Sequence, residues 1–256
     1  MSKTIQYGED FHGQFESDYR VGYGAPRLEF LRGRTFESHG AFLLPYLRAG
    51  HTVLDCGCGP GVISVGLARR VPQGSLTCID LSGYQLEEAR RRAQQAGVGN
   101  IHFFCQDARA LGFAHATFDV VFANALIEHL PVPAPALREM WRVLRPGGIL
   151  ALRSPNWTAL RLSPASDASS MCVELFASRF RSRRALADGG EVVRLLEQLH
   201  PAAVRRSESA EIHRPPGPFV EAIIASLPAA GPDTPPPTID AFRAWSRDPY
   251  SSAVEK

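Results

Sequence analysis

The sequence contains little cysteine and no long apolar run. Its five cysteines are an odd number without framework spacing, which argues against a disulfide scaffold and is typical of a reducing compartment. No run of about 18 apolar residues occurs, so no membrane span is predicted. The opening stretch, MSKTIQYGED, lacks the apolar centre of a secretory signal peptide. We therefore expect a cytoplasmic location.

The sequence also lacks an excess of charge of either sign. Its formal net charge is +2, so no global field favours nucleic acid as a partner. Short basic runs at 90–92, 181–184 and 205–206 are interpreted as solvated faces. Hydrophobic residues make up 45% and charged residues 21% of the 256 residues, the balance of a globular protein. This length allows one large domain, or a domain with an added lid.

The most informative stretch is VLDCGCGPG at 53–61, where an apolar run ends in an acid and glycines follow at alternate positions. The apolar run is typical of the end of a buried strand. Gly57, Gly59 and Gly61 predict a turn at which the backbone bends sharply and a ligand comes close. Pro60 suits the first turn of a following helix. A strand, a glycine turn and a helix N-terminus together predict a ligand site.

From residue 51 onward, apolar strands alternate with helical stretches. This alternation favours a parallel sheet that helices cover on both faces. Right-handed crossovers then predict a doubly wound α/β sheet, with the ligand at the carboxyl ends of its strands. The predicted strands are 52–56, 75–81, 100–106, 118–123 and 148–152, and the helices between them are 62–70, 84–96 and 135–144.

Residues 35–155 are expected to form the core of the domain. A helix that begins at Thr35 or Ser38 and ends near residue 48 is predicted before the first strand. Residues 156–256 are interpreted as an insertion and the C-terminal part of the same domain, where crowded prolines predict rigid, irregular connections. The elements predicted there are helices at 171–180, 191–199, 219–227 and 238–247, and a strand at 202–213.

Residues 1–34 are interpreted as an N-terminal helical cap. Aromatic residues recur there at every fourth position, so a helix would carry them on one face. This face either packs against a core or belongs to a mobile cap that closes over a substrate. The aromatic residues are Tyr7, Phe11, Phe15 and Tyr19.

The spacing of the glycines bears on the ligand. A dinucleotide fingerprint, G-x-G-x-x-G, would need a third glycine at position 62, which is Val62. The pattern present is G-x-G-x-G, and Asp55 precedes it. A carboxylate at that point would repel a pyrophosphate, whereas it would suit a ligand with a cationic end. S-adenosylmethionine carries an α-ammonium and a sulfonium and has no phosphate.

Two further acids follow the next two predicted strands. Asp80 ends the second strand and is placed to accept both hydroxyls of a ribose. Asp107 follows the third strand and is placed to accept the exocyclic amine of adenine, with Leu81 and Ala108 as apolar walls. Both acids have an alternative role as caps of the next helix, and the two roles can coexist. Acids at three successive strand ends predict S-adenosylmethionine as the ligand.

The segments VLDCGCGPG, CIDLS, FFCQDA, FDVVFANALIEHL and LREMWRVLRPGG resemble the successive motifs of one family. They are similar to the motifs of class I S-adenosylmethionine-dependent methyltransferases, in the style of the small-molecule group that includes ubiquinone and menaquinone methyltransferases. The resemblance covers roughly residues 34–155. It implies a Rossmann-like methyltransferase fold with S-adenosyl-L-methionine as the cofactor.

The resemblance also implies roles for individual residues. The three glycines would pass beside the methionine moiety, Asp80 would hold the ribose and Asp107 the adenine. Asn124 would lie near the transferred methyl group, and Arg34 is the candidate partner of the methionine carboxylate. The predicted cofactor-binding set is Arg34, Asp55, Gly57, Cys58, Gly59, Gly61, Asp80, Leu81, Gln85, Asp107, Ala108 and Asn124.

Residues after the fourth and fifth strands are the candidates for chemistry on the substrate. His129 is a candidate general base for an acidic substrate proton. In the alternative interpretation, Glu128 and His129 structure the turn and pack the helix. Trp157 is either a substrate platform or a core residue that ties down the insertion. The predicted substrate residues are Tyr7, Phe11, Tyr19, Asn156 and Trp157, and no metal site is predicted, because Cys56 and Cys58 have no paired ligands nearby in the sequence.

These interpretations predict an enzyme that transfers a methyl group to an N, O or C nucleophile of a small molecule, by in-line attack on the sulfonium methyl. Three alternatives stay open. The first is a cyclase of the same fold that uses the cofactor without methyl transfer, and the second is a non-catalytic binding subunit. The third is an RNA methyltransferase, favoured only if the basic runs share a face with the cleft. We expect a monomer or a homodimer with a small-molecule substrate as its partner.

Overall fold

The computed structural model describes residues 31, 33–156, 160–181, 190–207, 209, 211–213, 217–226, 236–247 and 252–255. The described residues divide into two compact units, of which the first ends at Ser154 and the second begins at Pro155. The predicted cap, with Tyr7, Phe11, Phe15 and Tyr19, falls outside the described residues, as does Trp157. Within the described ranges, no helix is both long and apolar enough to cross a membrane.

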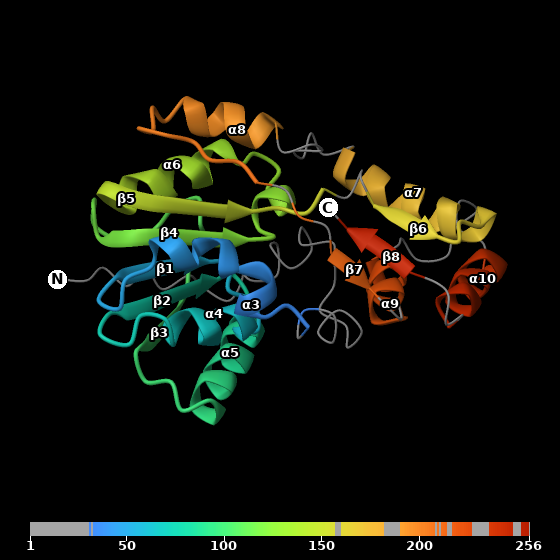
Figure 1. Ribbon diagram of the computed structural model, residues 1–256, viewed down its shortest axis with the longest axis horizontal. Coiled ribbons are helices and arrows are strands. Elements are labelled where there is room, and N and C mark those ends of the chain that lie inside the picture. The colour runs from blue at the N-terminus through green and yellow to red at the C-terminus, as the bar shows by residue number, and fades with distance from the viewer. Residues whose placement is uncertain are drawn as a thin grey trace. The chain divides into compact units, whose positions relative to one another are not determined.

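The first unit is built on a five-stranded parallel sheet with the order β3-β2-β1-β4-β5 (Figure 1). The predicted doubly wound α/β fold is therefore confirmed. The central strand is buried because it carries apolar side chains toward both faces of the sheet, and Val53 and Leu54 have no exposed surface. The strands are β1 (Thr52–Cys56), β2 (Ser75–Asp80), β3 (Ile101–Cys105), β4 (Phe118–Asn124) and β5 (Leu144–Arg153).

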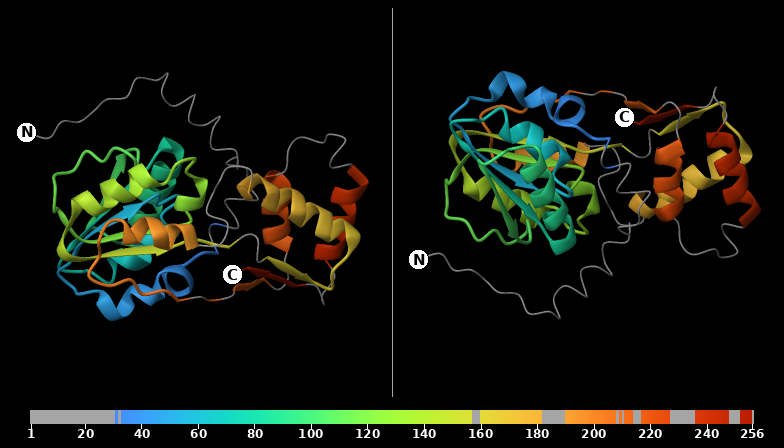
Figure 2. Two further views of the ribbon diagram at one scale, coloured as in Figure 1. Left: turned by 90° about the horizontal axis from the view of Figure 1, so that it is seen from above. Right: turned by 90° about the horizontal axis from the view of Figure 1, so that it is seen from below.

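Helices cover both faces of this sheet. The strand order reverses between β1 and β4, so right-handed crossovers carry α4 and α5 over one face and α6 over the other. α3 contacts α4, and Figure 2 shows α3 and α6 on opposite sides of the sheet. The elements of this layer are α3 (Phe36–His39), η1 (Ala41–Tyr46), α4 (Val62–Ala68), α5 (Gly83–Gln95), η2 (Ile127–His129) and α6 (Ala134–Val143).

The single helix predicted from residue 35 to about 48 is wrong. Thr35 caps α3 in a reciprocal capping box with Ser38, but the helix ends after one turn at Gly40, and η1 follows. Pro45 lies inside η1, where a missing backbone N–H is incompatible with a continuing α-helix. Packing at the end of α3 is close, because a Cβ at Gly40 would lie 2.4 Å from the ring of Phe36.

The predicted start of the fifth strand at Gly148 is also wrong. β5 begins at Leu144, and the RPGG sequence forms an irregularity within the strand. Pairing with β4 jumps from Leu144 to Ile149 while β4 advances only from Phe118 to Val120. Gly147 absorbs the extra length with a φ of 76°, a conformation that suits glycine.

A polar cluster holds the amino-terminal ends of β1 and β4 together. Asp119 accepts hydrogen bonds from the backbone N–H of Thr52 at 2.8 Å and from its hydroxyl at 2.7 Å. Arg145 forms an ion pair with the same carboxylate at 2.7 Å. Partial burial of Asp119 opposes ionisation, but these donors prevail and lower its pKa to about 2. The carboxylate therefore stays ionised throughout the neutral range.

The second unit has its own small core and an antiparallel sheet with the order β6-β8-β7. Phe219 and Phe242 are buried at its centre, and the Trp245 indole donates a hydrogen bond to the Pro164 carbonyl at 2.6 Å. Of the strand predicted at 202–213, the described part contains only β7. The elements are β6 (Arg161–Ser163), α7 (Asp167–Arg181), α8 (Gly190–Glu197), β7 (Glu211–His213), α9 (Gly217–Ser226), α10 (Pro236–Ser246) and β8 (Ser252–Glu255).

Candidate functional site

The glycine turn lies at the carboxyl end of β1, beside the point where the strand order reverses. This is the position at which open α/β sheets bind their ligands. Gly57, Gly59 and Gly61 all have positive φ angles, of 73°, 52° and 74°. The backbone N–H groups of Gly57 and Cys58 donate to the Ile79 carbonyl, at 2.8 Å and 3.0 Å. The turn is therefore attached to the end of β2.

The three glycines have different surroundings. A Cβ at Gly61 would lie 2.7 Å from the Cβ of Ala89, so Gly61 allows α5 to pack against the turn. A Cβ at Gly57 would lie 3.1 Å from the side chain of Leu126. A Cβ at Gly59 would meet no atom within 4 Å. Open space therefore lies beside Gly59, where a ligand can approach the backbone.

Asp80 connects the ends of β1 and β2. One carboxylate oxygen accepts the backbone N–H of Gly59 at 2.9 Å, and the other accepts that of Ser82 at 2.9 Å. Burial raises the pKa of Asp80, although the backbone donors oppose this shift. Ser82 is also the N-cap of α5. Asp80 thus holds the glycine turn and still has acceptor capacity, since each carboxylate oxygen has two lone pairs.

Asp55 lies below the turn, with an exposed fraction of 2%. The hydroxyl of Ser64, in the first turn of α4, donates to its carboxylate at 2.6 Å. Burial raises the pKa of Asp55 to about 7, against the lowering effect of this hydrogen bond. Ser64 is not among the residues predicted from the sequence, and its spacing of nine residues from Asp55 is no recognisable motif.

Asp55 makes a pH-dependent contribution to stability. Its folded pKa of about 7 exceeds its ordinary value of 3.8, so the folded protein retains a proton that the unfolded chain loses across this range. The contribution therefore decreases as pH rises from about 4 to 7, by about 1.4 kcal/mol per unit, and is constant above. We expect the free energy of unfolding of the ligand-free wild type to decrease between pH 5 and pH 7. In ligand-free Asp55→Asn, which has no carboxylate to titrate at this position, we expect a smaller decrease.

Urea unfolding at the two pH values measures this difference. Asp119→Asn is the matched control, because the pKa of Asp119 is about 2 and its carboxylate stays ionised between pH 5 and 7. The control is expected to be less stable than the wild type at both pH values by a similar amount. Equal pH slopes in Asp55→Asn and in the wild type would contradict the raised pKa.

Asp107 follows β3 and lies beside the end of β2, since the Gln106 N–H donates to the Asp80 carbonyl at 3.2 Å. Its carboxylate binds Arg109, whose backbone N–H, Nε and Nη2 all donate to it at 2.7–3.0 Å. Ala108 is buried, and Leu81 is half-buried. The ion pair between Asp107 and Arg109 is not predicted by the sequence pattern.

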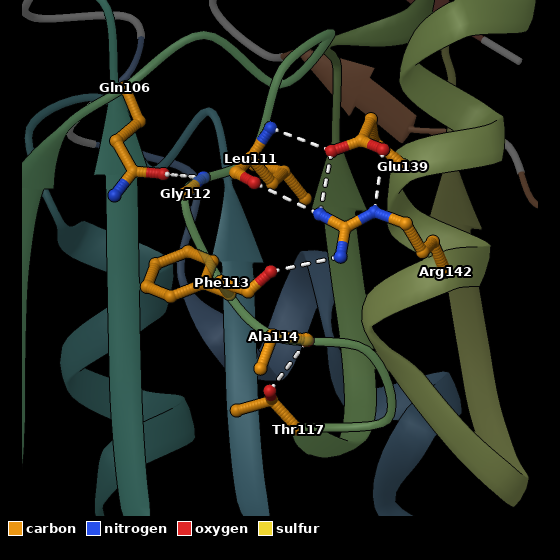
Figure 3. Close-up of polar contacts among 8 residues, drawn as sticks. All are labelled: Gln106, Leu111, Gly112, Phe113, Ala114, Thr117, Glu139 and Arg142. Atoms are coloured by element: carbon orange, nitrogen blue, oxygen red, sulfur yellow. Dashed lines mark hydrogen bonds and ion pairs between the residues drawn. The ribbon is translucent and has the colours of Figure 1, made fainter. Parts of the chain in front are cut away.

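The connection that follows Asp107 is held by α6 (Figure 3). Arg142 donates to the carbonyls of Leu111 and Phe113, each at 2.9 Å, and Glu139 accepts the Leu111 N–H at 2.8 Å. Arg142 and Glu139 also form an ion pair at 2.7 Å. We call these two residues the α6 clamp. The α6 clamp therefore attaches the connection that follows Asp107 to α6.

The other predicted cofactor residues lie at several points of the first unit. Arg34 is buried and precedes Thr35, the N-cap of α3, and Gln85 is buried in the first turn of α5. The Gln85 side-chain carbonyl is buried without a hydrogen-bond partner among the described residues. Asn124 ends β4 and pairs in register with Arg153 of β5. Ala125 follows with a φ of 53°, an uncommon angle for a residue other than glycine.

The segment after β4 contains a buried carboxylate. Glu128 has an exposed fraction of 3% and accepts a hydrogen bond from the Ser154 hydroxyl at 3.0 Å, which joins the ends of β4 and β5. His129 is half-buried at the end of η2. Asn156 belongs to the second unit. Contact with Cys78 and burial raise the pKa of the Cys58 thiol, so it stays protonated at neutral pH.

Among the residues that the structure describes, no cluster of three or more His, Cys, Asp or Glu side chains could hold a metal ion. The basic run at 90–92 has partners within the first unit. Arg90 and Arg91 pair with Glu87 and Glu88 of the same helix, at 3.6 Å and 2.7 Å. Arg92 donates to the Pro60 carbonyl at 3.1 Å. The guanidinium of Arg92 therefore supports the glycine turn from α5.

Residues 53–148 match the protein family described as "Methyltransferase domain". The chain is 39% identical over 146 residues to "Probable methyltransferase ltbC" of Aspergillus luteorubrus. The matched segment covers 54% of this chain and 51% of that protein. It is 33% identical to "Methyltransferase GfsG" of Streptomyces halstedii, over 72% of this chain and 64% of the relative. The chain thus spans between about half and two thirds of the length of these curated relatives.

A solved SAM-dependent methyltransferase from Aquifex aeolicus superposes on 78% of this chain and 92% of its own, with a TM-score of 0.52 and 18% sequence identity. At this identity the likeness concerns the fold. The matched sequence segment contains β1 to the RPGG irregularity of β5, and therefore the glycine turn, Asp80 and Asp107. Residues 53–148 thus match a methyltransferase domain in sequence, and the chain shares the fold of a solved SAM-dependent methyltransferase.

Proposed function

We propose that the protein is an S-adenosylmethionine-dependent methyltransferase that transfers a methyl group to an N, O or C nucleophile of a small molecule. The observation that carries this proposal is the arrangement of three carboxylates around the glycine turn. Asp55 is the penultimate residue of β1, Asp80 is the last residue of β2, and Asp107 follows β3, so the three acids lie at the carboxyl ends of three adjacent strands. A nucleoside with a cationic tail and no phosphate is complementary to this edge.

The described residues fit this cofactor. The open space at Gly59 admits a ligand against the backbone. Asp80 has remaining acceptor capacity for ribose hydroxyls, and the buried Gln85 carbonyl has no donor within the described part of the chain. A cationic group near Asp55 would favour the ionised form of this acid, whose pKa of about 7 makes it responsive. When bound, S-adenosylmethionine supplies an electrophilic methyl group on its sulfonium.

The protein's own contribution is alignment of the acceptor and exclusion of water, which supply much of the rate in transfers of this kind. We assign acceptor choice to residues 1–34 and 156–256, which flank the core at 35–155. Tyr7, Phe11, Tyr19, Asn156 and Trp157 remain the candidate substrate residues, and His129 remains the candidate general base. All five cysteines are free thiols, which supports a reducing, cytoplasmic location.

A screen of small-molecule acceptors with methyl-labelled cofactor, followed by mass analysis, tests the proposal. We expect labelled acceptor and S-adenosylhomocysteine in equal amounts. Methylthioadenosine, or a rearranged acceptor without label, would contradict methyl transfer and favour the cyclase interpretation. Cofactor binding without turnover of any acceptor would favour a binding subunit. Light scattering on the same sample distinguishes a monomer from a homodimer.

A further inference from the structure

We propose that Arg109 is a positioning residue that makes the nucleobase pocket selective for adenine over hypoxanthine. The proposal rests on the proposed function, because it needs the cofactor's base to lie at Asp107. Arg109 binds no ligand itself in this account. It acts on the carboxylate that receives the base.

Arg109 directs three N–H donors at the carboxylate of Asp107. Its backbone N–H donates to Oδ1 at 2.8 Å, and its Nη2 donates to Oδ2 at 2.7 Å. Its Nε lies between the two oxygens, at 3.0 Å from Oδ1 and 2.9 Å from Oδ2. Three N–H groups of one residue thus point at one carboxylate. A carboxylate has about four acceptor positions, so about one position remains.

These donors fix the orientation of the Asp107 carboxylate. The Asp107 side chain is 11% exposed, and the Arg109 side chain is 31% exposed. A planar guanidinium that binds both oxygens of a carboxylate restrains its rotation as well as its position. The remaining acceptor position is therefore held in one direction. The Ala110 N–H, which donates to the Asp107 carbonyl at 3.0 Å, holds the backbone of the same turn.

Adenine and hypoxanthine differ in the hydrogen-bonding group that would face Asp107. The exocyclic amine of adenine is a hydrogen-bond donor, so it satisfies a single fixed acceptor. Hypoxanthine carries a carbonyl oxygen at the same ring position, and that oxygen would face the carboxylate without a donor between them. An unmatched buried polar pair of this kind is costly. A freely rotating carboxylate could turn away from the oxygen, whereas the carboxylate that Arg109 holds cannot.

Calorimetric titration with S-adenosylhomocysteine and S-inosylhomocysteine tests the proposal. We expect the wild type to prefer the adenine ligand by at least about tenfold. In Arg109→Gln, the Kd of the adenine ligand is expected to rise about tenfold while that of the inosine ligand changes little, so the preference is lost. Arg109→Lys retains the positive charge but lacks the bidentate guanidinium. Its preference for the adenine ligand is expected to lie between those of the wild type and Arg109→Gln. Circular dichroism checks that each variant is folded.

Arg91→Gln is the matched control, since Arg91 forms an equally short ion pair with Glu88 on the exposed side of α5. Arg91→Gln should prefer the adenine ligand over the inosine ligand as strongly as the wild type does. If both ligands weaken equally in Arg109→Gln and Arg109→Lys, Arg109 has only a structural role and the proposal is wrong. An unchanged preference also contradicts it, while the proposed function stands. A wild type that binds neither ligand would overturn the proposed function together with this inference.

Discussion

Asp80→Ala is expected to weaken the binding of S-adenosylhomocysteine about 10- to 150-fold, which corresponds to about 1.5–3 kcal/mol for hydrogen bonds to a charged group. The substitution removes the acceptor proposed for the ribose hydroxyls. It also removes the acceptor of the Gly59 and Ser82 N–H groups, so the glycine turn loses its attachment to β2. Isothermal titration calorimetry measures the change in affinity, and thermal unfolding shows how much the fold itself is affected.

Two further variants separate the role of Asp80 from a general effect of charge. Asp80→Asn keeps one side-chain oxygen as an acceptor, and its affinity is expected to lie between those of wild type and alanine. Glu87→Ala removes a carboxylate of α5 whose side chain is 75% exposed, and it should leave affinity unchanged. Unchanged affinity in Asp80→Ala would overturn the assignment of the ribose site.

Gly61→Ala is expected mainly to lower the free energy of unfolding, whereas Gly59→Ala is expected mainly to weaken cofactor binding. At Gly61, the left-handed φ of 74° and a Cβ at 2.7 Å from Ala89 should together cost about 3 kcal/mol of unfolding free energy. At Gly59 only the φ of 52° opposes alanine, so the cost should be about 1 kcal/mol. The new methyl group at Gly59, however, enters the space beside the turn, and we expect cofactor affinity to fall by more than about tenfold.

Urea unfolding and calorimetry on the same two variants reveal the pattern. The double variant Gly61→Ala/Ala89→Gly is an internal control, because it removes the Cβ of residue 89 but leaves its Cα at 2.9 Å and the strained φ. It should be more stable than expected from the sum of the two single variants. If Gly59→Ala bound S-adenosylhomocysteine as the wild type does, the cofactor would not approach the backbone at this turn.

The strand ends are the part of the molecule that the sequence pattern predicts well. Buried parallel strands need continuous apolar runs, and an acid or glycine directly after such a run marks the point at which the chain leaves the core. This is why the predicted first strand, 52–56, coincides with β1, and why Asp80 and Asp107 are found where the pattern places them. The boundaries of α4, α5 and α6 lie within two residues of the predicted ones, and the start of α4 at Val62 coincides with its prediction.

Tertiary contacts account for what the pattern does not predict. The hydroxyl of Ser64 reaches Asp55 only because α4 begins directly above the end of β1. A lone arginine two residues after Asp107 has no periodicity that indicates an ion pair. Phe36 of α3 packs so closely that Gly40 and Gly66 have no room for a Cβ. Such close approaches follow from the assembled fold and not from local propensity.

The α6 clamp has a consequence for the order in which the domain becomes competent during synthesis. Asp55, Asp80 and Asp107 all precede Glu139 and Arg142 in the chain, yet the connection after Asp107 is held by those two later residues. A nascent chain that has emerged only as far as β4 contains every proposed cofactor carboxylate but lacks the donors and the acceptor that hold this connection. During synthesis, the connection after Asp107 can therefore be held by the α6 clamp only once α6 has emerged and packed.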